Sequence, residues 1–201
     1  MGKIELKKKQ KKDALFNTAF DLFTTKGIAK TTISDIVEKA GVAKGTFYLY
    51  FKDKYDIKNK LISHKASLLF QDAHKALQQT KVSNFEEQII FIIDHILNAL
   101  SQNPALLQFI AKNLSWGIFR EAFDSKVPQE DYDFYQAFLG MLKTDSLTCQ
   151  EPELMLFTIV ELVGSTCYNC ILHQKPVDLE TYKPHLYHTV RDILHSYLTP
   201  A

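Results

Sequence analysis

Apolar residues recur at helical spacing along most of the chain. Between residues 11 and 26 they fall at i, i+4, i+7 and i+8, the spacing of one helix face. The same period predicts further helices at 33–40, 44–51, 53–79, 84–102, 104–114, 130–144, 152–173 and 179–198. No Asn-Gly or Asp-Gly hairpin signal and no clear alternating strand pattern interrupts this series. We therefore predict an all-α fold.

The second and third of these helices are separated by a very short turn. Thr32 is a favourable N-cap, and Asp35 stands where the acidic residue of a capping box is found. Gly41 ends the helix, and a short third helix follows from Lys44 to Phe51. Helix, glycine-containing turn and helix together form a helix-turn-helix, whose second helix enters the DNA major groove. We interpret this segment as a DNA-binding element.

The short third helix divides its aromatic residues between two surfaces. At 100° per residue, Phe47 and Phe51 share a face that can pack on the two preceding helices. A helix of about eight residues is not stable alone, because helix nucleation is costly. Burial of each phenylalanine would supply roughly 1.5–3 kcal/mol to hold it in place.

The other residues of this segment are candidates for contact with DNA. The tyrosines Tyr48 and Tyr50 flank the buried face and can donate to phosphate oxygens. Gly45 permits close approach of the backbone, and Lys54 can hold a phosphate beside a helix N-terminus. Leu49 cannot hydrogen-bond a base but can contact a thymine methyl group.

The stretch "TTISDIVEKAGVAKGTFYLYFKDK" at residues 31–54 resembles the DNA-binding motif of the TetR family of bacterial transcriptional regulators. The resemblance implies a homodimer with a three-helix DNA-binding domain at 1–52, including a basic arm at 1–10. A helical ligand-binding and dimerisation domain would occupy 53–201, with the last two helices packed against the partner subunit. The DNA contacts carried over are Thr32, Lys44, Gly45, Thr46, Tyr48, Leu49, Tyr50 and Lys54.

Charge is distributed unevenly along the chain. Residues 1–60 contain 14 Lys, no Arg and 7 Asp or Glu, a net charge of +7, whereas the remainder carries −6. A basic first third indicates a polyanionic partner at one end of the molecule. The lysines between Lys7 and Lys12 fit either an arm beside the DNA backbone or a solvated tail.

Aromatic residues in the second part of the chain are candidates for an effector site. Core packing and a ligand cavity use the same residue types, so both interpretations remain open. The candidate ligand-binding residues are Phe91, His95, Phe109, Trp116, Phe119, Phe138, Met141 and Tyr168. They predict a small apolar or aromatic effector.

Cysteine and histidine spacing raises a second possibility. Cys167 and Cys170 are three residues apart with His173 beyond them, but they lie in one apolar helix and can pack as small hydrophobic residues. The residues His185, His188 and His195 lie on the last helix. We expect no metal and no cofactor, and we keep redox or metal control by the cysteines as the alternative.

Other classes of protein are less well supported. The sequence has no phosphate-binding glycine loop, nucleophile elbow or HExxH motif, so no enzymatic activity is expected. No apolar run approaches the roughly 18 residues that span a bilayer, so no membrane partner is expected. An odd number of cysteines, 3, fits a reducing cytoplasm.

The sequence thus predicts a transcriptional regulator, taken here as a repressor, that an effector releases from a palindromic operator. A regulator without a small-molecule pocket, controlled by a protein partner or by its cysteines, is the alternative.

Overall fold

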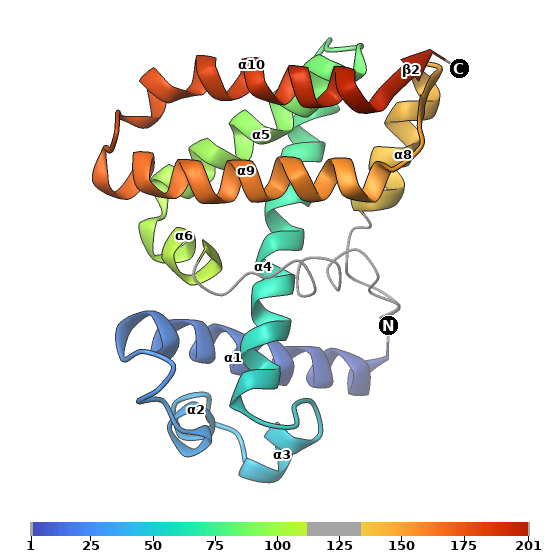
Figure 1. The fold of residues 1–201 in the computed structure, drawn as a ribbon. Helices are drawn as coiled ribbons and strands as arrows, with labels where there is room; N and C mark the ends of the chain where they lie inside the picture. Colours follow the sequence, from blue (N-terminus) through green and yellow to red (C-terminus); the bar gives the residue numbers. More distant parts are fainter. Residues whose placement is uncertain (1, 112–133, 201) are drawn as a thin grey trace. The chain divides into compact units, whose positions relative to one another are not determined.

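The computed structural model describes residues 2–111 and 134–200, and most of them are helical (Figure 1). The helices are α1 (Lys3–Thr25), α2 (Ile33–Lys39), α3 (Lys44–Tyr48), α4 (Lys54–Leu77), α5 (Phe85–Gln102), α6 (Pro104–Ala111), α8 (Phe134–Thr144), α9 (Pro152–His173) and α10 (Leu179–Tyr197). The prediction of an all-α fold is confirmed. One small addition is an antiparallel pair of strands, β1 (Leu147–Cys149) and β2 (Leu198–Pro200). Strands of 3 residues are too short to give an alternating pattern.

The chain forms two compact units, Met1–Ser63 and His64–Ala201, called here the N-terminal and C-terminal units. The division falls inside α4, so this helix contributes residues to both units. The functional boundary that we placed between residues 52 and 53 remains a prediction about where the DNA-binding residues end.

Helix α1 starts earlier than its apolar pattern indicated. The predicted start near Lys11, preceded by a basic arm at 1–10, is corrected, because α1 begins at Lys3. No glycine or proline lies between Lys3 and Lys26, and lysine, glutamine and glutamate are good helix formers. At its start, the Glu5 carboxylate accepts a hydrogen bond from the Gly2 N–H at 3.0 Å. The lysines from Lys7 to Lys12 therefore lie on an ordered helix.

Helix α2 is capped as predicted. The Asp35 N–H donates to Thr32 Oγ1 at 3.1 Å, and the Thr32 N–H donates to Asp35 Oδ2 at 2.8 Å. Lys26 Nζ lies 2.7 Å from the same carboxylate oxygen. The hydrogen bond from Lys26, followed by those from Thr32, lowers the pKa of Asp35 to about 2.

Glycines with positive φ lie in the connections on both sides of α2. Gly27 has φ +85° after α1, and Gly41 has φ +67° in the turn before α3. Such backbone conformations are strained for residues with a side chain, so these glycines fix the directions of α2 and α3. Helix α3 ends at Tyr48, whereas the sequence predicted a helix to Phe51.

The core of the C-terminal unit is built from α5, α8, α9 and α10, with α9 and α10 side by side (Figure 1). Fully buried side chains from these helices include Phe138, Met155 and Val190, each 0% exposed. The apolar segment "QIIFIIDHIL" forms the middle of α5, and its residues Ile89, Ile90, Ile92 and Ile93 are buried, in agreement with its predicted central place.

A polar cluster joins α10 to α5 within this unit. Lys183 is 7% exposed, and its ammonium lies 2.9 Å from Asp94, 2.8 Å from Glu180 and 2.6 Å from Asn98. The Tyr187 hydroxyl donates to Asp94 at 2.5 Å. Burial opposes ionisation of Asp94, but the hydrogen bonds from Tyr187, Lys183 and Asn98 outweigh it and lower the pKa of Asp94. The buried charge is therefore fully paired, which such burial requires.

Helix α9 is strongly apolar, although much of it is not buried. By length and composition it could cross a bilayer, contrary to our expectation that no segment would be long enough. It packs on α10, α6 and α5, yet only 28% of its most apolar stretch is buried within this chain. Leu154 and Phe157 on α9 are 52% and 38% exposed. The helix thus leaves part of its apolar surface exposed.

Candidate nucleic-acid interface and candidate ligand cavity

Helix α3 has one buried and one exposed surface. Phe47 is 0% exposed and Phe51 2%, and their ring centroids lie 5.4 Å apart. Phe51 also lies 5.4 Å from the Phe16 ring of α1. On the opposite side Tyr48 is 54% exposed and Leu49 79%. The predicted division of the aromatic residues into anchors and surface residues is present in the structure.

The smaller residues of the predicted interface lie around this exposed surface. Lys44 and Gly45 are exposed, Thr46 is half-buried, and Gly45 has nothing within 4 Å of the position of an added Cβ. Thr32 is exposed, and because its oxygen accepts from the Asp35 N–H, its own proton is available to donate. Within the described residues no ion pair of Lys44 is observed.

Tyr50 and Lys54 are used differently from our prediction. The Tyr50 hydroxyl donates to the Lys8 carbonyl of α1 at 3.2 Å, so it ties α1 to the end of the recognition segment. The Lys54 ammonium donates to the carbonyls of Ile28, Ala29 and Thr31 at 3.0, 3.2 and 3.2 Å. These bonds occupy the three donors of the ammonium group and fix the connection between α1 and α2. The structure thus gives Lys54 a structural role within the N-terminal unit, and its contact with a phosphate stays a prediction.

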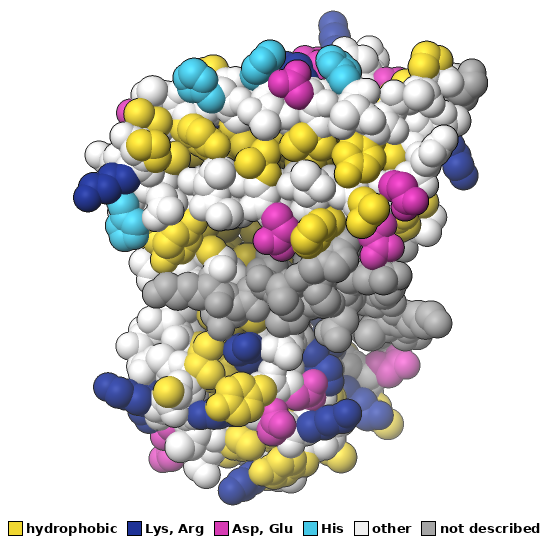
Figure 2. Space-filling view, viewed as in Figure 1, with side chains coloured by type: hydrophobic (Ala, Val, Ile, Leu, Met, Phe, Trp, Pro, Cys, Tyr) yellow, Lys and Arg dark blue, Asp and Glu magenta, His cyan; other side chains and the backbone are white. Residues whose placement is uncertain are grey.

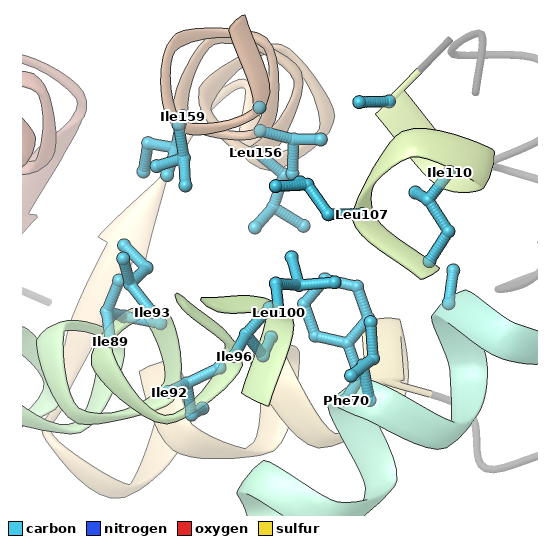
Figure 3. A pocket seen from close by; sticks show the side chains of 16 residues that line it. Phe70, Ile89, Ile92, Ile93, Ile96, Leu100, Leu107, Ile110, Leu156 and Ile159 are labelled. Atoms are coloured by element: carbon cyan, nitrogen blue, oxygen red, sulfur yellow. The ribbon is translucent and has the colours of Figure 1, made fainter. Parts of the chain in front are cut away.

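The C-terminal unit contains a cavity of about 140 Å³ between α4, α5, α6 and α9 (Figure 3). Figure 3 shows Ile89, Ile92, Ile93 and Ile96 of α5 on one side and Leu156 and Ile159 of α9 on the other. The lining residues are Ala66, Leu69, Phe70, Ile89, Ile92, Ile93, Ile96, Leu100, Leu107, Ile110, Ala111, Leu156, Ile159, Val160, Val163 and Gly164. Among the described residues, no lining side chain carries a polar atom.

The residues that we predicted to bind an effector lie elsewhere. Phe91 stacks on His95 with centroids 6.2 Å apart, and His95 Nε2 lies 2.8 Å from Asp72. Phe138 packs on Phe85 at 5.5 Å in the core. These contacts give the three predicted residues structural partners outside the cavity.

The other predicted effector residues divide into two groups. Phe109 is buried, Met141 is partly buried against the core and Tyr168 lies 6.1 Å from the His173 ring, and none of them lines the cavity. Trp116 and Phe119 fall outside the described residues. The predicted residues are mostly aromatic, whereas the described lining of the cavity is mainly aliphatic.

The cysteines are buried among helix side chains. Cys167 and Cys170 are each 2% exposed, and burial raises the pKa of the Cys167 thiol to about 11. Burial also raises the pKa of Cys170. A thiol that resists ionisation is a poor nucleophile and a poor metal ligand. Over the described ranges, no group of three or more His, Cys, Asp or Glu could hold a metal ion.

Comparison with known proteins agrees with this arrangement. Residues 15–60, which include α2, the turn and α3, match the model of the bacterial regulatory proteins of the tetR family. This match and the exposed, anchored α3 decide the assignment. The chain carries the N-terminal DNA-binding domain of the TetR family of transcriptional regulators.

Two proteins with similar sequences are named as HTH-type transcriptional regulators. The chain is 25% identical over 179 residues to an HTH-type transcriptional regulator of Staphylococcus aureus (strain USA300), covering 89% of this chain and 91% of that protein. It is 26% identical over 194 residues to the uncharacterized HTH-type regulator YerO of Bacillus subtilis (strain 168). That alignment covers 94% of this chain but spans only 55% of YerO.

Among solved structures, the fold is similar to that of SmeT, the repressor of the multidrug efflux pump SmeDEF of Stenotrophomonas maltophilia. The TM-score is 0.61 at 15% identity, over 94% of this chain and 90% of SmeT. At this identity the likeness establishes the fold alone.

The sequence analysis did not predict the cavity in the C-terminal unit. The run of isoleucines in α5 was the available signal for it.

Proposed function

We propose that this TetR-family regulator acts as a homodimeric repressor in the cytoplasm. It would bind a palindromic operator through α2 and α3 and would leave the operator when a small molecule occupies the cavity of the C-terminal unit. The observation that carries this proposal is the exposed surface of α3, which two buried phenylalanines hold out from the core.

The exposed surface of α3 has the chemistry of a major-groove contact. Lys44 and Thr46 can hydrogen-bond base edges, and Tyr48 can donate to a phosphate. Leu49 is an aliphatic side chain that is 79% exposed on the same surface, which suits a thymine methyl group. Gly45 leaves room for the DNA backbone, and Thr32 can donate to a phosphate from the start of α2.

The lysine-rich start of α1 extends this surface. Because the Tyr50 hydroxyl bonds the Lys8 carbonyl, the first turns of α1 are held beside the recognition segment. Lys7, Lys8 and Lys11 are exposed on these turns. We assign them to phosphate contacts, each of which would steepen the dependence of operator affinity on salt by about 0.9 in a double-logarithmic plot.

The apolar surface of α9 and α10 supports a dimer. A band of hydrophobic side chains follows these two helices on the face seen in Figure 2. Exposed Leu154 and Phe157 on α9 belong to this apolar helix, and such patches mark interaction sites on soluble proteins. A second copy of the chain would cover the patch by symmetric contact. Two α3 helices would then meet the two halves of one operator.

An effector would release the operator by shifting the protein from a DNA-binding conformation to one that does not fit the operator. A ligand needs only about 1–3 kcal/mol of preference for one state to change operator affinity substantially. Helix α4 carries cavity-lining residues such as Ala66 and begins next to the recognition segment, so it is our candidate for the transmitting element. The presence of a cavity favours this mechanism over a regulator without a pocket, and the buried thiols disfavour control by cysteine chemistry.

The proposal is tested by selecting operators from random DNA duplexes with the purified protein. We expect selection of a site with two-fold symmetry and a complex that contains an even number of protein chains, measured by native mass spectrometry. A selected site without symmetry, bound by one chain, would contradict the dimeric operator mechanism. Failure to enrich any duplex would contradict the DNA-binding function.

A further inference from the structure

From the cavity lining we infer that the effector is a small, uncharged hydrocarbon, about the size of a benzene ring or a six-carbon chain. This inference rests on the proposed function and specifies the chemistry of the ligand in the cavity between α4, α5, α6 and α9 (Figure 3). The lining of 16 residues consists of isoleucine, leucine, valine, alanine, glycine and one phenylalanine.

The described part of the lining offers no partner to ligand groups that need a hydrogen bond. Four helices supply the described lining, and helix backbone groups already bond within each helix. The lining side chains that the structure describes offer neither a donor nor an acceptor. A hydroxyl or amine placed there loses its bonds to water without replacement, and a carboxylate or ammonium loses more. Hydrocarbon groups incur no such loss.

The size of the cavity limits the ligand. Its volume is about 140 Å³. Apolar cavities of about 150 Å³ stay dry and take up benzene. Each additional methylene that fits should tighten binding roughly fourfold, because its burial is worth about 0.8 kcal/mol. The gain should stop once the empty volume is filled.

A matched pair of substitutions on α4 distinguishes the cavity from the packed core. Ala66 is 3% exposed and lines the cavity, whereas Ala73 is 0% exposed and does not line it. Both residues belong to the C-terminal unit. In Ala66→Leu the added atoms can enter the cavity, so the protein should keep its melting temperature and lose ligand binding. In Ala73→Leu the added atoms meet packed side chains, so the melting temperature should fall.

The ligand test compares toluene with phenol and with benzoate, three aromatic molecules of similar size. Binding to the full-length protein without DNA is followed by calorimetry and by chemical-shift changes of isoleucine methyl groups. Toluene should bind at least tenfold more tightly than phenol, and benzoate should not bind. Ala66→Leu should remove toluene binding.

Three outcomes would overturn the inference: tighter binding of phenol or benzoate, absence of toluene binding, or toluene binding that Ala66→Leu leaves unchanged. A separate measurement of affinity for the selected operator tests the proposed function. If toluene binds in the cavity and operator affinity does not change, the ligand chemistry stands and the effector mechanism fails. If benzoate releases the operator and Ala66→Leu abolishes this response, the mechanism stands and the hydrocarbon inference fails.

Discussion

The surface of α3 and the cavity beside α5 are two candidate sites built on opposite principles. At α3, a few residues of distinct chemistry are held in place by two anchors, Phe47 and Phe51, and by the capped helix before them. In the cavity, 16 ordinary apolar residues surround a volume that none of them fills. A site made of particular residues can be identified in a sequence, whereas a site made of empty volume depends on how helices from distant segments pack.

Among the substitutions that test this comparison, the largest loss of stability is expected at Phe47, an anchor of α3. Phe47→Ala should lower the free energy of unfolding of the N-terminal unit by about 3–5 kcal/mol, because it removes a fully buried ring and leaves a cavity. Leu49→Ala, two residues away and 79% exposed, should change it by no more than about 0.5 kcal/mol. Urea unfolding followed by circular dichroism measures both. Similar values for the two variants would mean that α3 is not anchored through Phe47.

Added side-chain volume should destabilise the protein in the packed core but not beside the cavity. Ala73→Leu should lower the free energy of unfolding of the C-terminal unit by roughly 1–3 kcal/mol through overpacking. Ala66→Leu should leave it nearly unchanged, because its new atoms can occupy the cavity of about 140 Å³. Chemical denaturation of the two variants gives this difference. Equal destabilisation would indicate that the space beside Ala66 is already filled.

The two tyrosines of the recognition segment offer a finer comparison. Tyr48→Phe should weaken operator binding about tenfold, since a hydrogen bond to a charged group contributes roughly 1.5–3 kcal/mol. Tyr50→Phe should have a smaller effect, because that hydroxyl donates to the Lys8 carbonyl within the protein. Fluorescence anisotropy with the selected duplex at fixed salt measures both affinities. A larger loss for Tyr50→Phe would reverse our assignment of the two residues.

The capping carboxylate of α2 gives the smallest expected effect. The pKa of Asp35 falls from 3.8 to about 2 in the folded protein, because the hydrogen bonds from Lys26 and Thr32 stabilise its charged form. The stabilisation is therefore present above pH 4 and is lost as the pH falls toward the folded value of about 2. NMR titration of Asp35 checks this directly. A midpoint near 3.8 would show that the capping interactions do not favour the carboxylate.

Much of the N-terminal unit follows from residue types at fixed positions. Thr32, Asp35 and Gly41 each have a local role that their chemistry dictates, and the structure places all three as predicted. The structural role of Lys54 was not predicted, because its partners, the carbonyls of Ile28, Ala29 and Thr31, lie 23 to 26 residues earlier in the chain. A backbone carbonyl exists at every position, so no sequence pattern marks those that a lysine will reach.

The C-terminal unit was predictable in its helices and much less so in its site. The helical period located α5, α9 and α10 to within a residue or two. The predicted effector residues that the structure describes instead form core or surface contacts, such as the Phe91–His95 stack. Residue type cannot separate these uses, because packing a core and lining a cavity require the same apolar side chains. The outcome depends on small differences in how α4, α5, α6 and α9 approach one another.

The account's central claim, that the exposed surface of α3 binds DNA, is tested most directly by reversing one charge. Lys44→Glu should weaken binding to the selected duplex by tenfold or more at fixed salt, without changing the melting temperature. Lys143→Glu on α8 is the matched control, since Lys143 is also exposed but belongs to the C-terminal unit. The account predicts a loss for the first variant that clearly exceeds the second. Equal affinities for wild type and Lys44→Glu would contradict it.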